Sequence, residues 1–335
     1  MSQPQPDKSA QRFVIHDLAH HNGQTNFARD VRAGLTSNPK QLFPKYLYDA
    51  LGSKLFEAIC QTDEYYLTRA ENEILSRHAD QIVRCVPDCQ TLIELGSGSA
   101  EKTRSVIEAL LRNESSLLFV PIDISHSALE ESSHALLKAY PSLRVEAYAA
   151  DYFDGLAAIR PPTNGRALVL FLGSNIGNFE KEAAAVFLRA IRKVLRAGDA
   201  LLLGADLKKD GPTLERAYND AVGVTRAFIL NQLARINRDF GANFELRAFE
   251  LVSVYDETAG RIDVYLESTR RQSVGIPGLD LSLTIAAGER LHMENAYKYD
   301  LDELSLMAHQ TGFVREKTWF DEHQRFSSNL FVAAD

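Results

Sequence analysis

The chain has 335 residues, 45% of them hydrophobic, and a formal net charge of −8 at pH 7. This charge excludes nucleic acid and anionic membranes as favoured partners, because both repel an acidic protein. No apolar run approaches the roughly 20 residues that span a bilayer, and residues 1–11 form a polar tail without a signal-peptide core. We therefore expect a cytoplasmic protein, taken to be a monomer, that acts on a small molecule.

The cysteines and the first histidines predict neither a disulfide framework nor a metal site. His16, His20 and His21 have helical spacing, but no cluster of carboxylates or thiols joins them, so an exposed helix face is the preferred interpretation. The chain has three cysteines, Cys60, Cys85 and Cys89. Cys85 and Cys89 have no second pair of ligands that would complete a zinc site, so all three are expected to be free thiols in a reducing compartment.

Hydrophobic spacing predicts helices in the first part of the chain. One or two helices are expected over residues 12–35, and another within residues 46–60. A third helix is expected to begin at Thr68, with Thr68 as the N-cap and Glu71 completing a capping box.

Strands and helices alternate from residue 91. Strands are predicted at 91–95, 117–122, 144–149, 167–172 and 200–205, and helices at 102–111, 127–139 and 181–195. Such alternation predicts a parallel sheet with helices on both faces.

The pattern changes after Asp206. Helices are predicted at 213–238 and 301–311, and strands at 249–255, 261–268, 281–285, 296–299, 313–320 and 329–332. A chain of this length exceeds one usual hydrophobic core, so two lobes are expected. We predict an α/β lobe from residues 70–206 and 299–335, and an α+β lobe from residues 1–69 and 207–298.

A tight glycine turn joins the first predicted strand of the α/β lobe to its helix. Gly96 lets the chain turn without a Cβ clash, and Gly98 lets a ligand approach the backbone. A dinucleotide-binding dehydrogenase would have a third glycine at position 101, where this chain has Glu101. A carboxylate at a helix N-terminus repels a pyrophosphate but not S-adenosylmethionine, which is a cation without phosphate. The turn thus favours a methyl-donor site, although a glycine turn alone is also typical of a plain strand–helix connection.

Polar residues follow the next strands at their carboxyl ends, where open parallel sheets bind ligands. Asp123 is well placed to accept from ribose hydroxyls, and Asp151 from an adenine amino group with Tyr152 nearby. Either aspartate could instead cap the helix that follows it. Residues 171–178 end the fourth strand, where a methyltransferase presents its substrate, and they do not form a hydrolase nucleophile elbow.

Several blocks of sequence go beyond this general pattern. In order, they are KYLYDALGSKLF at 45–56, DEYYLTR at 63–69, ELGSG at 94–98, FLGSNIGN at 171–178, RAYND at 216–220, GVT at 223–225 and AAGE at 286–289, followed by Glu294. Their order and spacing resemble the histidine Nα-methyltransferase family of ergothioneine biosynthesis. The resemblance implies a Rossmann-like class I methyltransferase sheet with an inserted α+β substrate-binding domain. It also implies stepwise trimethylation of an amino-acid α-amine, giving hercynine from L-histidine.

The resemblance further implies a role for each matching residue, and no metal. Asn178 and Tyr218 would bind the backbone end of the amino acid and, with Tyr65, form the catalytic group. Phe56, Tyr65 and Gly173 would line the pocket, and Glu294 would hydrogen-bond the imidazole. The implied S-adenosylmethionine site is Tyr48, Gly96, Ser97, Gly98, Lys102, Asp123, Asp151 and Tyr152.

Two substrate-pocket positions depart from the family pattern. The serine that follows the glutamate by two residues is Ala296 here, and a methionine on the hairpin strand is Val264. Losing the hydroxyl removes a hydrogen bond worth about 1 kcal/mol, and the valine changes the pocket volume. Histidine remains the first substrate hypothesis. The alternatives are tryptophan or another aromatic amino acid, and a non-catalytic protein that binds S-adenosylmethionine.

Overall fold

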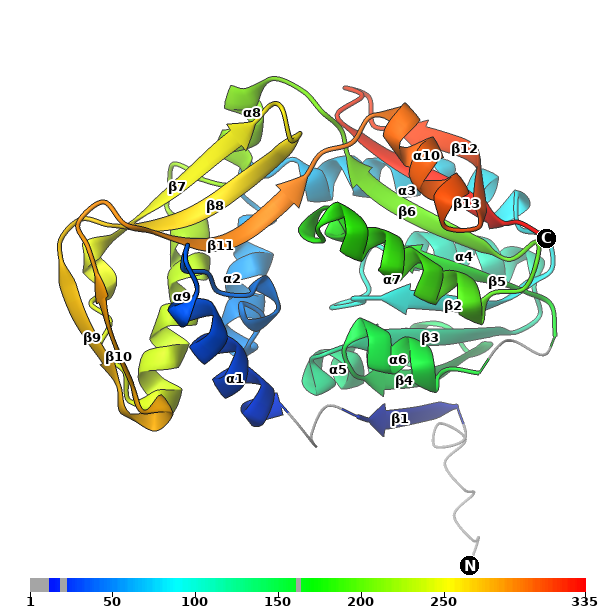
Figure 1. The fold of residues 1–335 in the computed structure, drawn as a ribbon. Helices are drawn as coiled ribbons and strands as arrows, with labels where there is room; N and C mark the ends of the chain where they lie inside the picture. The colour runs from blue at the N-terminus through cyan, green and yellow to red at the C-terminus, as the bar shows by residue number, and fades with distance from the viewer. Residues whose placement is uncertain (1–11, 19–22, 161–163) are drawn as a thin grey trace, which may run out of the picture.

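The computed structural model describes residues 12–18, 23–160 and 164–335. The predicted polar tail at 1–11, and His20 and His21, lie outside these ranges. Figure 1 shows the elements in two groups, one around a large sheet and the other around a smaller sheet with the N-terminal helices packed beside it. Within the described ranges, no helix is both long and apolar enough to cross a membrane.

The large sheet confirms the predicted α/β class. Its eight strands run in the order β1-β4-β3-β2-β5-β6-β13-β12. Strands β1 to β6 pair in parallel, whereas β13 is antiparallel to both β6 and β12. The bounds are β1 (Phe13–Asp17), β2 (Cys89–Leu95), β3 (Leu117–Asp123), β4 (Leu143–Ala149), β5 (Arg166–Phe171), β6 (Ala200–Asp206), β12 (Phe313–Phe320) and β13 (Phe326–Ala333).

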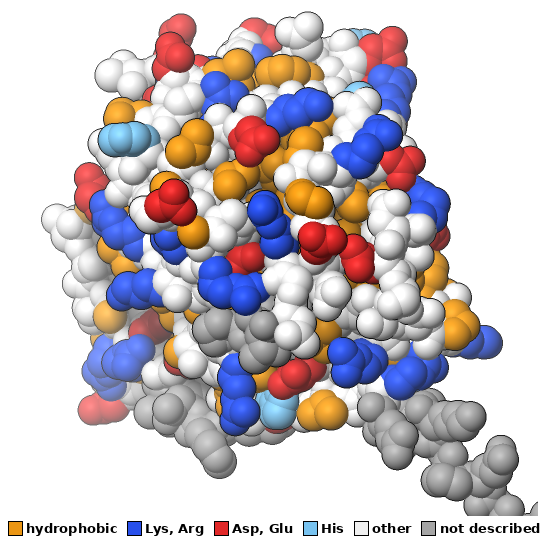
Figure 2. Space-filling view, turned by 90° about the vertical axis from the view of Figure 1, so that its right-hand side faces the viewer, with side chains coloured by type: hydrophobic (Ala, Val, Ile, Leu, Met, Phe, Trp, Pro, Cys, Tyr) orange, Lys and Arg blue, Asp and Glu red, His pale blue; other side chains and the backbone are white. Residues whose placement is uncertain are grey.

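Helices cover both faces of this sheet, because neighbouring strand residues point to opposite sides. Leu92 and Leu168 join the core beneath α3 (Leu67–Arg84), α4 (Arg104–Asn113) and α5 (His126–Ala139). The adjacent residues Ile93 and Val169 join the core beneath α6 (Tyr152–Ala158), α7 (Lys181–Val194) and α10 (Leu301–Gln310). On the side that Figure 2 shows, acidic and basic side chains are interspersed, so the net negative charge is not gathered into one patch there.

The second group contains an antiparallel sheet in the order β11-β8-β7 and a β9–β10 hairpin. Its helix α2 packs against α9, and Asp49 helps to fix that contact. The Asp49 carboxylate caps α2 by accepting from Gly52 N and also accepts from the Asn231 side chain of α9, both at 2.8 Å. The bounds are α1 (Gly23–Thr36), α2 (Ala50–Ile59), α8 (Gly211–Ala217), α9 (Val224–Phe240), β7 (Phe249–Asp256), β8 (Arg261–Ser268), β9 (Gln272–Ile276), β10 (Leu281–Ile285) and β11 (Arg290–Tyr297). Short 3-10 turns are η1 (Pro44–Tyr46), η2 (Asn175–Asn178), η3 (Leu246–Ala248) and η4 (Pro277–Leu279).

Several predicted elements differ from the structure. The predicted helix over 12–35 is wrong at its start, because Phe13–Asp17 pairs with β4 and extends the sheet edge, so His16 lies on a strand. The predicted helix over 213–238 is two helices, separated at Gly223, whose φ of 84° is left-handed. Strand β9 was not predicted, and β11 begins at Arg290 rather than Ala296.

The predicted capping box at Thr68 and Glu71 is also wrong. Helix α3 begins at Leu67, and the Thr68 hydroxyl donates to Cys60 Sγ at 3.2 Å. Glu71 is fully buried; its carboxylate accepts from Gly173 N at 2.8 Å and from Lys102 Nζ at 2.6 Å. Glu71 therefore ties α3 to the end of β5 and to the segment after the glycine turn, instead of closing its own helix.

We predict that Gly204→Ala destabilises the protein by about 1–3 kcal/mol, the usual cost of overpacking a core. A Cβ at Gly204 in β6 would lie 2.1 Å from Glu71 Oε1, so the carboxylate would have to leave its partners. Urea unfolding measures the change. Gly275→Ala is the matched control, because a Cβ there meets no described atom within 4 Å. An equal effect of the two substitutions would contradict the prediction.

Candidate active site

A cavity lies where the carboxyl end of β5 meets α2, α8, α9 and β11. Its walls come from segments as distant in sequence as residues 48 and 294, and residues 173–178 contribute Ser174, Asn175 and Asn178 to its polar lining. It brings together many of the residues that the sequence singled out for the substrate. The lining is Tyr48, Phe56, Ile59, Tyr65, Gly173, Ser174, Asn175, Asn178, Ala217, Tyr218, Thr225, Phe228 and Glu294.

Four aromatic rings form one wall of this cavity. The ring centroids of Tyr48 and Phe56 are 5.4 Å apart, those of Phe56 and Tyr65 are 6.0 Å apart, and those of Tyr65 and Tyr218 are 6.3 Å apart. All three pairs meet edge to face, the favourable geometry for aromatic rings. Burial raises the pKa of Tyr48 and of Tyr65 well above that of a free phenol, so both hydroxyls stay protonated at neutral pH.

A constrained turn after β5 also lines the cavity. Gly173 and Ser174 both have left-handed backbone, with φ of 75° and 58°. A serine rarely adopts this conformation, and here its Oγ accepts from Asp206 N at 2.9 Å. The turn leads into η2, where a Cβ on Gly177 would lie 2.6 Å from the Tyr297 carbonyl oxygen. Asn178, at the end of η2, is thereby held close to β11.

Glu294 reaches the cavity from β11. It pairs with Val264 of β8, and Ala296 follows it by two residues on the same face. Val264 and Ala296 are buried beside the glutamate but do not line the cavity. Burial raises the pKa of Glu294 to about 7, with Lys298 acting in the opposite direction.

The glycine turn and the end of β3 form a second cluster. Asp123 accepts from Gly98 N and from Ser125 N, each at 2.9 Å. A Cβ on Gly96 would lie 2.9 Å from the Tyr152 hydroxyl and 3.6 Å from Asn175 Nδ2. Asn175, which also lines the cavity, therefore lies between the glycine turn and the predicted substrate residues.

The other residues predicted for the donor site have different surroundings. Tyr48 lies in the aromatic wall, and Lys102 forms its ion pair with buried Glu71. Asp151 caps α6, because its Oδ1 accepts from Asp154 N at 2.9 Å. Ser97 is 6% exposed, and its Oγ has no hydrogen-bond partner among the described residues.

Comparison with known proteins places this arrangement in a family. A family model described as "Histidine-specific methyltransferase, SAM-dependent" matches residues 27–333. The chain is 40% identical to the histidine N-alpha-methyltransferase of Mycolicibacterium smegmatis, over 94% of this chain and 97% of that one. It is also 40% identical to the histidine N-alpha-methyltransferase of Mycobacterium tuberculosis, over 95% and 98%. Ergothioneine biosynthesis protein 1 of Neurospora crassa is 32% identical over 84% of this chain and 32% of that protein.

The chain belongs to the histidine-specific methyltransferase family. It is thus an S-adenosylmethionine-dependent methyltransferase. The glycine-turn cluster fits that ligand. A Cβ at Gly98 would meet no described atom within 4 Å, so there is space beside the backbone, and the buried Ser97 hydroxyl has no hydrogen-bond partner among the described residues. The Asp123 carboxylate suits hydroxyl donors, and Glu101 opposes phosphate. Among the described residues, no group of three His, Cys, Asp or Glu side chains could hold a metal ion.

Sequence reasoning missed several cavity residues of this methyltransferase. Thr225 and Phe228 line it from α9, and Asn175 joins its two sides. Thr225 lies within a matched block at 223–225, which was the available signal. Phe228 has ordinary core spacing on a helix, so its pattern does not separate it from buried packing residues.

The raised pKa of Glu294 predicts a pH-dependent effect on stability. A carboxyl whose pKa is about 7 in the fold and 4.5 when unfolded binds more protons in the fold, so its contribution to stability falls as pH rises from about 4.5 to 7. Glu294→Gln removes this loss. The variant should therefore gain stability relative to the parent between pH 5 and pH 8, on the order of 2 kcal/mol.

Urea unfolding of both proteins at the two pH values measures this gain. Buried Glu94, whose pKa burial raises to about 8, is present in both proteins and cancels in the comparison. A constant difference between variant and parent across this range would show that Glu294 ionises normally.

Proposed function

We propose that this methyltransferase converts L-histidine to its Nα-trimethyl betaine, hercynine, as a step of ergothioneine biosynthesis. The observation that carries the proposal is the convergence of Asn178, Tyr218 and Glu294 on one cavity beside the glycine turn. Asn178 and Tyr218 supply an amide and a hydroxyl for the amine and carboxylate. Glu294 also lines the cavity, and its carboxyl group suits an imidazole N–H.

The donor side of the site is assigned to a separate set of residues. Gly96, Gly98 and Asp123 would hold S-adenosylmethionine together with Ser97, Lys102, Asp151, Tyr152 and Tyr48. S-adenosylmethionine supplies the methyl group, which is bonded to a positively charged sulfonium sulfur. Tyr48 belongs to the aromatic wall of the substrate cavity, so it would contact the region where the methyl group and the amine meet.

The amine must be neutral to attack, because the lone pair forms the new bond. Peptide α-amines have a pKa of about 7.7–8.0, so much of the substrate arrives protonated at neutral pH. Tyr48 and Tyr65 keep their own protons, since burial raises both pKa values, and therefore do not serve as bases. The proton leaves to water, and the main contribution of Asn178 and Tyr218 is to hold the amine at attack distance.

The aromatic wall explains how one amine could be methylated repeatedly. Ring faces of Tyr48, Phe56 and Tyr65 stabilise an alkylammonium by about 0.5–2 kcal/mol each. Mono- and dimethylated intermediates thus bind the same wall as the substrate, which favours completion to the trimethyl product.

A second substrate class follows from the residues beside Glu294. Val264 and Ala296 are both buried on its face of the β8–β11 pair, and the family pattern has methionine and serine there. The valine changes the space next to the ring, and the alanine lacks a hydroxyl that would select imidazole. Tryptophan, which also presents a ring N–H to Glu294, is therefore the second candidate.

The decisive experiment is a mass-spectrometric transfer assay with S-adenosylmethionine and histidine, tryptophan, tyrosine or phenylalanine. We expect trimethylhistidine to be the main product. Asn178→Ala should lower kcat/KM by about 10-fold or more, because it removes a hydrogen bond to a charged group. Preference for another amino acid would reject histidine, and transfer to none would favour a protein that only binds S-adenosylmethionine.

Ala296→Ser tests the specificity argument directly. The added hydroxyl should improve histidine binding by about 1 kcal/mol, or about fivefold in KM, with little effect on tryptophan. Steady-state kinetics with both amino acids measures the change. Ser305→Ala on α10 is the control, because the Ser305 hydroxyl donates to Leu301 O, accepts from Arg315 Nε and does not line the cavity. An unchanged preference after Ala296→Ser would show that residue 296 does not select the ring.

A further inference from the structure

A buried lysine lies directly behind the substrate cavity. Lys298 follows β11, and its side chain is fully buried. Its ammonium lies 2.9 Å from the Tyr218 hydroxyl oxygen and 3.0 Å from an Asp206 carboxylate oxygen. Lysines are almost never fully buried without such partners, so these two contacts account for its position.

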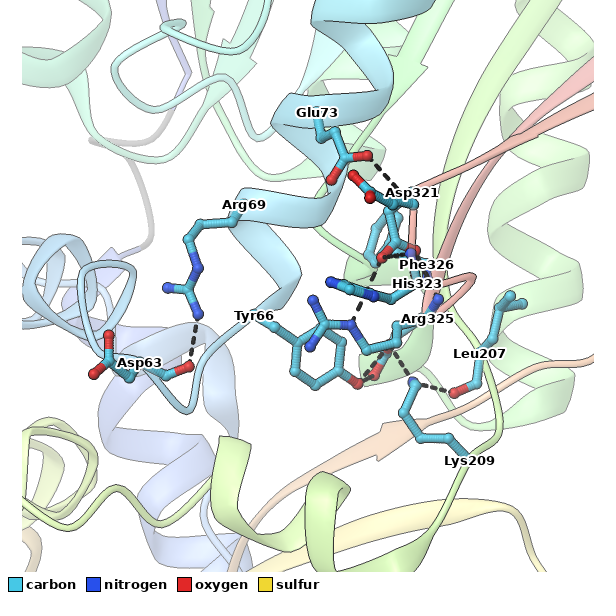
Figure 3. A network of polar contacts seen from close by, with 12 residues as sticks. Asp63, Tyr66, Arg69, Glu73, Leu207, Lys209, Asp321, His323, Arg325 and Phe326 are labelled. Atoms are coloured by element: carbon cyan, nitrogen blue, oxygen red, sulfur yellow. Dashed lines mark hydrogen bonds and ion pairs between the residues drawn. The ribbon is translucent and has the colours of Figure 1, made fainter.

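Asp206, at the end of β6, anchors this lysine. Its carboxylate also accepts from the Tyr66 hydroxyl at 2.8 Å and from Lys209 Nζ at 2.7 Å. In Figure 3 the side chains of Tyr66 and Lys209 approach one another, close to the Arg325–Asp321 pair. Burial raises the pKa of Asp206, but Lys298 and Lys209 outweigh it and hold the pKa below its usual range. Two ammonium groups, those of Lys298 and Lys209, thus share the Asp206 carboxylate.

The chemistry of the Lys298–Tyr218 contact fixes its direction. An ammonium has only donors, so the Tyr218 oxygen must accept. The hydroxyl proton of Tyr218 is then left to donate elsewhere, and Tyr218 lines the cavity together with Asn178. A donor backed by a buried positive charge matches a carboxylate. The same charge disfavours an ammonium nearby and so favours the neutral form of the substrate amine.

We propose that Lys298, anchored by Asp206, is a positioning residue that makes Tyr218 a hydrogen-bond donor to the substrate carboxylate and so selects amino acids over amines without a carboxylate. The inference rests on the proposed function and adds the origin of its carboxylate selectivity.

Lys298→Met tests it, because methionine is similarly long but uncharged. The measurement is kcat/KM for L-histidine and for L-histidinamide, whose neutral amide replaces the carboxylate. The parent should prefer histidine. In the variant, the histidine value should fall about 10- to 100-fold, mainly through KM, as expected for loss of a hydrogen bond to a charged group. The histidinamide value should fall much less, because that substrate loses only the effect of the charge on its amine, and calorimetry should give an unchanged affinity for S-adenosylmethionine.

Lys208→Met is the matched control. The Lys208 ammonium pairs with Asp300 and Glu303 outside the cavity, so this variant should keep the parent's preference. Equal losses for both substrates in Lys298→Met, or an unchanged ratio, would overturn the proposal. If Lys298→Met fails to fold, Tyr218→Phe keeps the Lys298–Asp206 pair and must show the same loss of preference for the carboxylate. A retained preference in Tyr218→Phe would also overturn it.

The assay separates this inference from the proposed function. A parent that methylates another amino acid rejects histidine as the substrate, and that amino acid with its amide then tests Lys298. A parent that methylates no amino acid rejects both proposals.

Discussion

The ion pair between Asp206 and Lys298 joins the two groups of elements at the site. Asp206 ends β6, where the chain leaves the large sheet, and Lys298 directly follows β11, where the chain returns to it. The pair is supported by backbone hydrogen bonds, because Tyr299 N donates to Asp206 O at 3.0 Å and Lys208 N donates to Tyr299 O at 3.0 Å. The backbone N–H of Asp206 also donates a hydrogen bond to the side-chain oxygen of Ser174, whose backbone is left-handed. The ion pair and these hydrogen bonds therefore fix the turn after β5 relative to β11, the strand that carries Glu294.

A buried ion pair by itself adds little to the stability of a fold. Removing two charges from water costs several kcal/mol per ion, and apolar residues of similar volume often stabilise a core as well. The pair Glu71–Lys102 repeats the pattern on the other side of the turn, where Glu71 also binds Gly173 N. Both pairs lie at the carboxyl edge of the sheet, next to the cavity. Their position favours a role in fixing the geometry and charge of the site.

The sequence predicted the strands of the large sheet well because each is a short apolar run between glycine or polar turns. It failed at β1, since Phe13–Asp17 gains its strand conformation only by pairing with β4. It also failed at Glu71, which has good capping-box spacing but a partner about a hundred residues away, at Gly173. Most of the predicted cavity residues lie in matched blocks, but Asn175 and Thr225 were missed although they lie in such blocks too. Lys298 and Phe228 could not be found, because a lysine after a strand and a phenylalanine on a helix have no distinctive local pattern.

If the residues have the proposed roles, the charges around the amine explain both how it becomes neutral before each transfer and why methylation stops at the trimethyl product. In this proposal the amine binds near two positive groups, the sulfonium of the donor and the Lys298 ammonium, and both would disfavour its protonated form. Histidine and its mono- and dimethyl derivatives can lose a proton and become neutral in this field. The trimethyl product cannot, because its nitrogen carries a permanent charge. The reaction therefore stops at the betaine, because its nitrogen has no lone pair left and the positive charge of the sulfonium has passed to it with the last methyl group.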